Sequence, residues 1–429
     1  MPLIVQKYGG TSVGTPERIR NVARKLIETQ RAGNDVVAVV SAMSGVTDDL
    51  LKLAQKISRK PTERELDLLL ATGEQSAIAL TAMAINALGG RAVSLTGAAA
   101  GIVTDNFHTR AKIANITPRQ IHALLADDYI VIVAGFQGQT PQGEITTLGR
   151  GGSDLTAIAL AAALQADDCQ IFTDVDGVFT CDPKVVSDAS KMDEIAYDEL
   201  LEMAGAGSKV MQSRAVEFAK KFGVGFEVRS SLKDTPGTVA KEETPNMEDV
   251  VVRGVSVDRS QAKITICGVP DRPGCAGVIF SAISAANLSV DMIVQNASST
   301  GTTDLSFTLH KDDFDLAEKI LAPLVPKIGA AGMTAKSGVA KLSVVGIGMR
   351  SHSGVASRLC RCLGEADVNI QLISTSEIKI AVVIDESEVD RAARATHAAF
   401  GLSRPVTLPS ALARRSGSSP NELSASSPA

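Results

Sequence analysis

Lys7 ends an apolar run, 3-LIVQK-7, and directly precedes the glycine-containing turn 8-YGGTS-12. Glycines let backbone N–H groups approach phosphate oxygens, and a helix beginning at Pro16 would add the positive end of its dipole. A lysine at this point could bridge a nucleotide and a second anion. A P-loop places its lysine after the glycines, so this order indicates a different phosphate site. An ordinary surface lysine beside a strand-end turn is the alternative.

A second glycine-rich turn lies in 146-TTLGRGGSDLTAIALAAALQAD-167 and runs directly into an Ala/Leu-rich helical pattern. Arg150 offers a planar guanidinium suited to a carboxylate, and Asp154 could orient a lysine or a metal ion. Ser153 or Asp154 could instead serve only as the N-cap of the helix. A cap requires neither three glycines nor an arginine, so the turn indicates a binding site.

Two further stretches carry charge at expected element ends. In 171-IFTDVDGVFTCDPK-184, acidic residues follow a strand, at the edge where open α/β sheets bind ligands. Turn formation at the Asp-Gly pair 176–177 is the alternative. In 205-GAGSKVMQSRAVEFAKK-221, Lys209 stands at the start of a helix and opposes the helix dipole, which is more typical of function than of stability.

An imidazole base is missing from these stretches. The five histidines, at positions 108, 122, 310, 352 and 397, lie outside all four, and no Ser/His/Asp or Cys/His arrangement is visible. Phosphoryl transfer to a carboxylate fits this pattern, because the acceptor is already ionised at pH 7. Such an enzyme need only hold two anions in line and neutralise their charge.

Composition excludes several classes of protein. The 429 residues carry a formal charge of −5, which argues against nucleic acid as a partner. No apolar run is expected to span a membrane, and residues 1–11 lack signal-peptide features, so we predict a soluble cytoplasmic protein with no membrane partner. The six cysteines lack zinc-like spacing and are predicted to be free thiols.

The chain alternates short β-rich runs with longer helical ones up to about residue 240. This pattern predicts an α/β domain at 1–240, with a mostly parallel open sheet between helices. A helix is expected over 16–33, and strands are expected at 3–7, 36–40, 91–95, 129–135, 169–173 and 224–228.

Beyond a Pro- and charge-rich boundary at 233–249, the chain repeats itself with a shift of 80 residues. The segment 273-PGCAGVIFSAISAANLSVDMI-293 matches 353-SGVASRLCRCLGEADVNIQLI-373, with Asn287 and Asp367 at equivalent turns. Two α+β modules are predicted, at 250–330 and 335–402. The Ser/Pro-rich tail at 403–429 is predicted to be disordered.

Together these stretches resemble the aspartokinases of the amino acid kinase family, from Met1 to about Leu402. The motifs KYGGTS, SAMSGVTD, ATGEQ, GRGGSD, FTDVDGVFTCDP and GSKV occur in the order typical of that family. The resemblance implies ATP-dependent conversion of L-aspartate to 4-phospho-L-aspartate, the first step towards lysine, threonine and methionine. It also implies that Mg²⁺ arrives with ATP, without a side-chain metal cluster, and that the repeat forms two ferredoxin-like ACT domains.

The resemblance also assigns residues. Lys7 would stabilise the transferring phosphoryl group, and Asp154 would organise the catalytic lysines. The aspartate pocket would contain Ser41, Thr47, Glu74, Arg150, Gly151 and Ser153. The ATP site would contain Lys7, Gly9, Gly10, Thr173, Asp174, Phe179, Asp182, Lys184 and Lys209. For Glu74, the Ala/Leu-rich run around it favours a solvent-facing helix position when read without the family.

Lysine and/or threonine would act as allosteric effectors at the ACT domains. The effector residues would be Asp271, Gly274, Ala276 and Gln295 in the first module, and Asn369, Ile370, Ser376 and Glu377 in the second. Asp271 can take an effector's ammonium group, or can simply make a turn. Ser353 stands where related second modules have proline, and Lys184 where many relatives have arginine.

Homo-oligomers, dimers or tetramers, are expected through the ACT domains. An internal start at Met247 could give a separate regulatory subunit. Two alternatives stay open: a related kinase acting on another small acid such as glutamate, and a catalytically silent amino-acid sensor.

Overall fold

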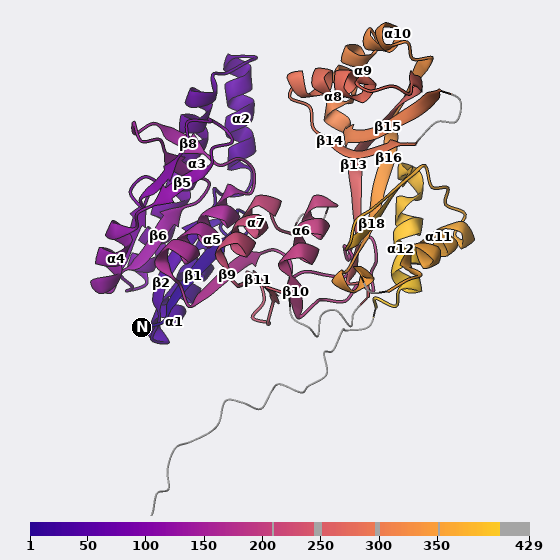
Figure 1. Cartoon of the computed structure of the whole chain (residues 1–429). Helices are drawn as coiled ribbons and strands as arrows, with labels where there is room; N and C mark the ends of the chain where they lie inside the picture. Colours follow the sequence, from indigo (N-terminus) through magenta and orange to yellow (C-terminus); the bar gives the residue numbers. More distant parts are fainter. Residues whose placement is uncertain (208–209, 244–250, 297–300, 351, 404–429) are drawn as a thin grey trace, which may run out of the picture.

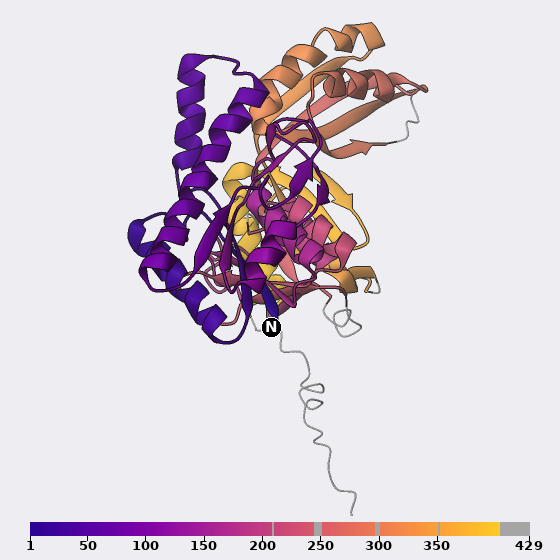
Figure 2. The same cartoon turned by 90° about the vertical axis from the view of Figure 1, so that its left-hand side faces the viewer.

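A computed structural model of the chain describes residues 1–207, 210–243, 251–296, 301–350 and 352–403. The N-terminal α/β part lies beside the C-terminal part in Figure 1, and it lies in front of most of the C-terminal part in Figure 2. The expectations placed on Lys209, Met247 and the tail from residue 404 fall outside the described residues.

The N-terminal part is built on an eight-stranded sheet with the order β10-β12-β11-β9-β1-β2-β6-β3. Every pairing in it is parallel except that of β11 with β12. All six predicted strands lie in this sheet, which confirms the mostly parallel α/β domain. The bounds of its strands are β1 (Leu3–Tyr8), β2 (Asp35–Val40), β3 (Ala92–Leu95), β6 (Ile130–Ala134), β9 (Asp168–Thr173), β10 (Glu194–Ala196), β11 (Phe226–Ser230) and β12 (Thr238–Lys241).

Helices cover both faces of this sheet. On one face, α1 (Pro16–Arg31) and α3 (Glu63–Ala87) pack their apolar sides against alternate residues of β2 and β6. On the other face, α5 (Gly152–Leu164) and α7 (Ser213–Phe222) pack against the residues in between. Because successive strand residues point to opposite faces, a strand covered on both sides must be apolar throughout, as β2 and β6 are.

Helix α1 shows how local chemistry fixes an element. The Thr15 hydroxyl accepts a hydrogen bond from the Arg18 N–H, and Pro16 occupies the first helical position, where a missing N–H costs nothing. The chain leaves the helix through Gly33, at φ 93°. This agrees with the helix predicted over 16–33.

Three further helices and a second sheet complete this part. The helices are α2 (Val46–Ile57), α4 (Arg119–Ala126) and α6 (Tyr197–Gly205). The four-stranded sheet has the order β5-β4-β7-β8, with β4 (Ile102–Thr104), β5 (Ile113–Ile116), β7 (Gln137–Gln139) and β8 (Ile145–Thr147). These short strands were not predicted, because three or four residues carry too little alternation to be recognised.

Among the described residues, α3 is long and apolar enough to cross a membrane. The expectation that no apolar run reaches that length was therefore wrong. Half of its apolar stretch is buried within the domain, and it contacts α1, β3, β6 and β8. This burial is typical of a core helix.

The C-terminal part is built on a six-stranded sheet with the order β14-β15-β13-β16-β18-β17. Its strands are β13 (Gly254–Pro270), β14 (Val290–Gln295), β15 (Thr302–His310), β16 (Gly332–Val345), β17 (Leu372–Thr375) and β18 (Lys379–Asp385). Its helices are α8 (Cys275–Ala285), η2 (Lys311–Asp313), α9 (Phe314–Leu321), α10 (Leu324–Ile328), η3 (Ile347–Arg350), α11 (Val355–Glu365), η4 (Glu386–Glu388) and α12 (Val389–Ala399).

The predicted repeat is visible in the backbone. Gly274 before α8 and Gly354 before α11 both have φ 97°. Asn287 and Asp367, matched in the sequence, both turn the chain in the left-handed region, at φ 60° and 53°. Asn and Asp tolerate that region better than other non-glycine residues, so the same turn is made twice.

The two modules share their central strands. Residues 254–258 of β13 pair with 341–345 of β16, beside the core that α11 and α12 cover. Residues 261–270 of β13 pair with β15 and belong to the core under α8 and α9. The division into modules at 250–330 and 335–402 stays a prediction. The strand pairing places residues 254–258 with the core of the second module.

A buried ion pair joins the two parts of the chain. The Nε atom of Arg253 lies 3.4 Å from Oε2 of Glu199 in α6, and the two side chains are 2% and 0% exposed. The same carboxylate accepts a hydrogen bond from the N–H of Ile347, in the second module. Burial raises the pKa of Glu199, while the Arg253 guanidinium opposes that rise.

Replacing Arg253 by methionine should lower the free energy of unfolding by about 3 kcal/mol, because Glu199 would be left buried without a cation. The measurement is thermal and denaturant unfolding followed by circular dichroism. The double variant Arg253→Met/Glu199→Gln should recover much of the loss. Wild-type stability in the single variant would contradict this account of the junction.

Candidate functional site

Two cavities are lined by loops of the N-terminal part, and one of them also borders the C-terminal part. The first, of about 400 Å³, is named here the Arg150 cavity. Its walls come from the end of β1, the loop before α2, the middle of α3 and the glycine-rich turn before α5. The second, of about 440 Å³, is named the Asp174 cavity and lies between the loop after β9, the end of α6 and strand β13.

A buried ion pair stands at the Arg150 cavity. Lys7, from β1, places its Nζ 2.6 Å from Oδ1 of Asp154, in the first turn of α5, and each side chain is 11% exposed. A buried ammonium without a partner would be strongly unfavourable, so the Asp154 carboxylate from α5 and the Lys7 ammonium from β1 stabilise each other. The alternative of an ordinary surface lysine is therefore wrong.

Two helices begin at the Arg150 cavity. Helix α2 starts after Gly45 and α5 starts after Gly151, both glycines being in the left-handed conformation. A Cβ on Gly151 would also lie 2.8 Å from Cβ of Gln212. Ser41, Thr47, Gly151 and Ser153, all predicted for the acceptor pocket, line this cavity. Converging helix N-termini favour an anion between them.

Glu74 lines the same cavity from α3 and is 3% exposed. Its Oε1 accepts a hydrogen bond of 3.1 Å from the N–H of Ala42, while Oε2 has no hydrogen-bond partner. Burial raises the pKa of Glu74 to about 7, and the hydrogen bond from Ala42 opposes the rise. The solvent-facing position that the sequence pattern favoured is wrong, because this side of α3 faces the cavity and the core.

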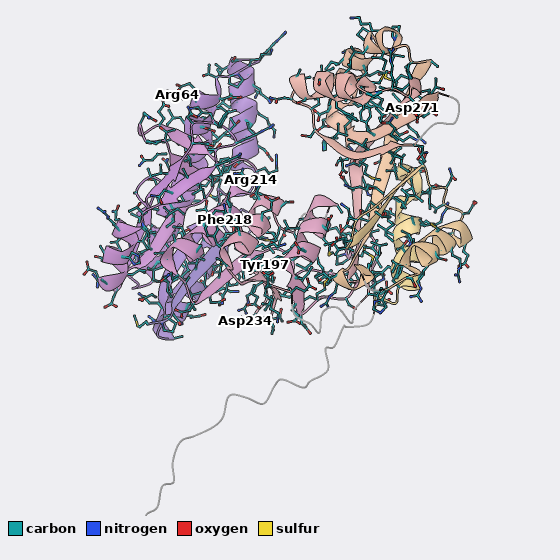
Figure 3. All side chains as sticks on the ribbon, viewed as in Figure 1. Arg64, Tyr197, Arg214, Phe218, Asp234 and Asp271 are labelled. Carbon is teal, nitrogen blue, oxygen red and sulfur yellow. The ribbon has the colours of Figure 1, made fainter. Side chains whose placement is uncertain are left out.

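The turn that carries Arg150 is held from α7. The backbone carbonyl of Arg150 accepts a 2.6 Å hydrogen bond from Nε2 of Gln212. Arg214, labelled in Figure 3, donates to the carbonyls of Leu148 and Ala111 at 2.7 and 3.0 Å. Sequence reasoning missed Arg214, because nothing in its helical context distinguishes it from a surface arginine.

The predicted ATP residues Thr173, Asp174, Phe179, Asp182 and Lys184 all line the Asp174 cavity. The opposite wall is the stretch 255–260 of β13, which no sequence pattern had indicated. Within the described ranges, no three His, Cys, Asp or Glu side chains form a metal-binding group. Asp174 and Asp182 offer the oxygen ligands that Mg²⁺ prefers, which suits a metal carried in with phosphates.

Gly9 and Gly10 line neither cavity. The N–H of Gly9 donates to the carbonyl of Phe172 at 3.3 Å, one residue before Thr173. The carbonyl of Gly10 accepts from the N–H of Ser44, and a Cβ on Gly10 would lie 2.7 Å from the carbonyl oxygen of Ala42. This turn therefore ties the loop before α2 to the strands β1 and β9.

The predicted effector residues occupy two places around the six-stranded sheet. Asp271 and Gly274 lie between β13 and α8, Ala276 is in the first turn of α8, and Gln295 ends β14 near the same end of the sheet. Figure 3 places Asp271 on the first module, away from Arg214. Asn369 and Ile370 precede β17, and Ser376 and Glu377 lie in the turn from β17 to β18.

Comparison with known proteins agrees with this architecture. The amino acid kinase family matches residues 2–229, and an ACT domain matches residues 264–322 and 342–400. An aspartate kinase of Pseudomonas fluorescens is 53% identical over 409 residues, covering 95% of this chain and 99% of its own.

Solved structures agree as well. An aspartate kinase from Synechocystis is 42% identical over 95% of this chain and 70% of its own, with a TM-score of 0.53. Escherichia coli aspartokinase III, in complex with aspartate and ADP, has a TM-score of 0.78 over 92% of this chain and 99% of its own, at 24% identity. The chain belongs to the aspartokinases, members of the amino acid kinase family that carry ACT domains.

The raised pKa of Glu74 predicts a pH dependence of stability. Between its unfolded value of 4.5 and about 7, the folded state binds more protons than the unfolded state, so stability falls as pH rises. Glu74→Gln should remove this dependence. Its free energy of unfolding should therefore rise by about 3 kcal/mol relative to that of wild type as the pH goes from 5 to 8. Denaturant unfolding of both proteins at pH 5 and pH 8 tests this. An equal change in the free energy of unfolding in wild type and Glu74→Gln would contradict it.

Proposed function

We propose that this chain phosphorylates the side-chain carboxylate of L-aspartate with ATP, giving 4-phospho-L-aspartate. The carrying observation is the Arg150 cavity, where the Lys7–Asp154 pair, Glu74 and two helix N-termini surround one space. Such a cavity offers a cation for a carboxylate and a carboxylate for an ammonium group, which is the pattern of an acidic amino acid. The kinship with aspartate kinases supports the same substrate.

In this proposal, each group has an electrostatic task. Arg150 and the N-termini of α2 and α5 take the carboxylates of aspartate, and Glu74 takes its ammonium group. Lys7 neutralises the charge that spreads over the phosphoryl group in the transition state, and Asp154 holds the lysine in place. No base is required, because the attacking carboxylate is already ionised at pH 7.

The nucleotide would occupy the Asp174 cavity. Lys184 would face its phosphates, while Asp174 and Asp182 would hold Mg²⁺ directly or through water. Bound Mg²⁺ supplies charge neutralisation on the phosphates. The turn at Gly9 is hydrogen-bonded to β9, which ends at Thr173, so the strand that carries Lys7 lies beside the strand that leads into the Asp174 cavity. Lys209 remains a proposed ATP residue on the strength of its motif alone.

An acyl-phosphate trap tests the activity. Protein, ATP and Mg²⁺ are mixed with hydroxylamine and either L-aspartate or L-glutamate, and hydroxamate is followed with time. Aspartyl hydroxamate should form, and Lys7→Ala should lower its rate by about a thousandfold, because a transition-state charge partner is lost. Lys220→Ala, which removes an exposed lysine paired with Asp198, is the matched control.

The outcomes separate the candidate functions. Glutamyl hydroxamate alone would indicate a kinase for a different acid. No hydroxamate with either acid, together with tight binding of lysine or threonine, would indicate a sensor on a kinase scaffold.

We further propose that lysine, threonine or both bind the ACT domains and inhibit the kinase, as in feedback control of an amino-acid pathway in the cytoplasm. The effector would contact Asp271, Gly274, Ala276 and Gln295 in the first module. In the second, the contacts would be Asn369, Ile370, Ser376 and Glu377. The route to the kinase is supported by β13, which is a central strand of the modules and a wall of the Asp174 cavity. Assembly into dimers or tetramers through the ACT domains belongs to the same proposal.

Titrating lysine, threonine and their equimolar mixture against the wild-type rate identifies the effector. Asp271→Asn should raise the half-inhibiting concentration by about tenfold, because it removes the charge facing the effector's ammonium group. Light scattering at micromolar concentration measures the assembly. Unchanged inhibition in Asp271→Asn, or a monomer in solution, would contradict the respective part of the proposal.

A further inference from the structure

Asp67 is a fully buried carboxylate for which the mechanism above has no task. It lies on α3 seven residues before Glu74, so the two acids share one side of the helix. Its side chain is 0% exposed. An ionised group this deep must be satisfied by hydrogen bonds, and its partners show what it holds.

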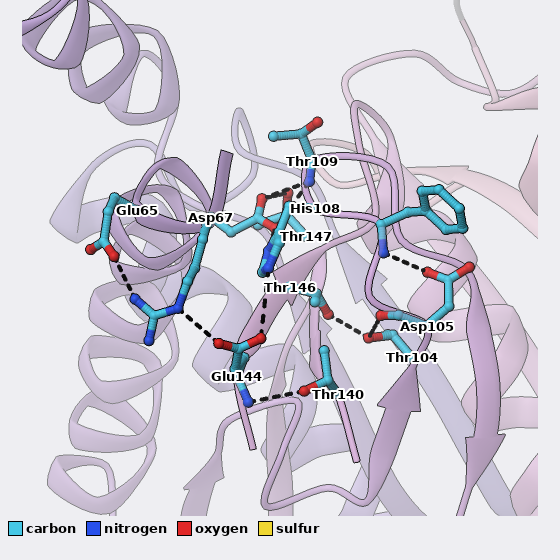
Figure 4. A network of polar contacts seen from close by, with 12 residues as sticks. Glu65, Asp67, Thr104, Asp105, His108, Thr109, Thr140, Glu144, Thr146 and Thr147 are labelled. Atoms are coloured by element: carbon cyan, nitrogen blue, oxygen red, sulfur yellow. Dashed lines mark hydrogen bonds and ion pairs between the residues drawn. The ribbon is translucent and has the colours of Figure 1, made fainter. Parts of the chain in front are cut away.

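Three neighbouring residues donate to Asp67 (Figure 4). The backbone N–H of Thr109 lies 3.0 Å from each carboxylate oxygen, and the hydroxyl of Thr147 lies 2.5 Å from Oδ1. Nδ1 of His108 lies 2.8 Å from Oδ2. Since an ionised carboxylate can only accept, Nδ1 of His108 carries its proton towards Asp67.

The carboxylate thereby joins three separate segments. Helix α3 is fixed to the loop between β4 and β5, which contains His108 and Thr109, and to the end of β8 at Thr147. Thr109 is held at φ 65°, a conformation that threonine rarely adopts. Local preference does not favour this conformation, and the hydrogen bonds from the Thr109 N–H to Asp67 help to hold it.

The segments that Asp67 holds form a wall of the Arg150 cavity. Thr109 and Thr147 both line it, together with Glu74 from the same helix. Thr147 comes three residues before Arg150, and a Cβ built on Gly149 would lie 3.3 Å from the carbonyl oxygen of Thr109. The loop that contains Thr109 therefore lies close to the turn that carries Arg150.

No residue of this network reaches the other cavity. The lining of the Asp174 cavity begins at Thr173 and contains neither Asp67 nor any of its three partners. A disturbance at Asp67 should therefore act on one substrate and spare the other.

We propose that Asp67 is a positioning residue for the acceptor amino acid. Its carboxylate fixes the Thr109–Thr147 wall against Glu74 and Arg150, and so sets the width of the pocket in which the acceptor is held. The inference rests on the proposed function, because it takes the Arg150 cavity as the acceptor pocket. In this proposal Asp67 does not contact the substrate, and it affects specificity by fixing the positions of Thr109 and Thr147.

Asparagine is the sharpest replacement at this position. It has nearly the same shape, but its amide nitrogen would face a donor, either the Thr109 N–H or the Nδ1–H of His108. Asp67→Asn should raise KM for aspartate by about tenfold, with KM for ATP within about twofold and kcat within about threefold of wild type. Initial rates by the hydroxylamine trap, varying each substrate in turn, give all three values.

Thr147 provides an independent pair of variants. Thr147→Val keeps the shape and removes the hydroxyl, and should raise KM for aspartate in the same direction. Thr147→Ser keeps the hydroxyl and should behave like wild type. Glu144→Gln, at the exposed rim of the network beside Arg64 and His108, is the matched control and should leave both KM values unchanged.

Each result decides the inference. A folded Asp67→Asn protein with wild-type KM for aspartate, or with both KM values raised alike, would overturn it. If Asp67→Asn fails to fold, the split between Thr147→Val and Thr147→Ser decides instead, and equal behaviour of the two would overturn it. An inactive wild type would overturn the proposed function itself. An active wild type whose Asp67 and Thr147 variants have unchanged KM for aspartate would overturn only the present inference.

Discussion

The structure depends on one lysine being brought inside the protein. Lys7 lies at the end of a strand near the centre of an eight-stranded sheet, and its only acceptable environment there is an opposite charge. Asp154 supplies that charge from the first turn of α5, whose apolar residues are covered by the sheet. The backbone order of the domain, with β1 between β2 and β9 and α5 packed across them, brings the two together.

Around this pair, the two cavities differ in how they are built. The wall of the Arg150 cavity is held by hydrogen bonds to groups behind it, with Thr147 donating to Asp67 and the glycine-rich turn accepting from Arg214. The Asp174 cavity has exposed charged side chains on one side and a strand of the C-terminal part on the other. The first is suited to selecting a small charged molecule, and the second to receiving a larger one whose fit depends on a neighbouring domain.

Much of this could be predicted from residues alone. Strands such as β2 and β6 are continuous apolar runs, and α1 has a cap, a first-turn proline and a terminal glycine. Glu74 could not be placed from its local pattern, because burial of a carboxylate is decided by what packs on the helix. Asp67 and Arg214 left no pattern either, since their partners come from segments distant in the sequence. Strand β13 was missed as a cavity wall for the same reason.

Strand β13 has a consequence for how such a protein can be divided. It begins beside the Asp174 cavity, in the core of the second module, and ends in the core of the first. A fragment ending at residue 240 would contain every proposed catalytic side chain, yet its Asp174 cavity would lack the wall formed by β13. The stretch of sequence that contains the proposed catalytic residues and the folded unit that completes the cavity therefore have different boundaries. A gene fission at this point would produce two polypeptides that must find each other to complete a single binding site.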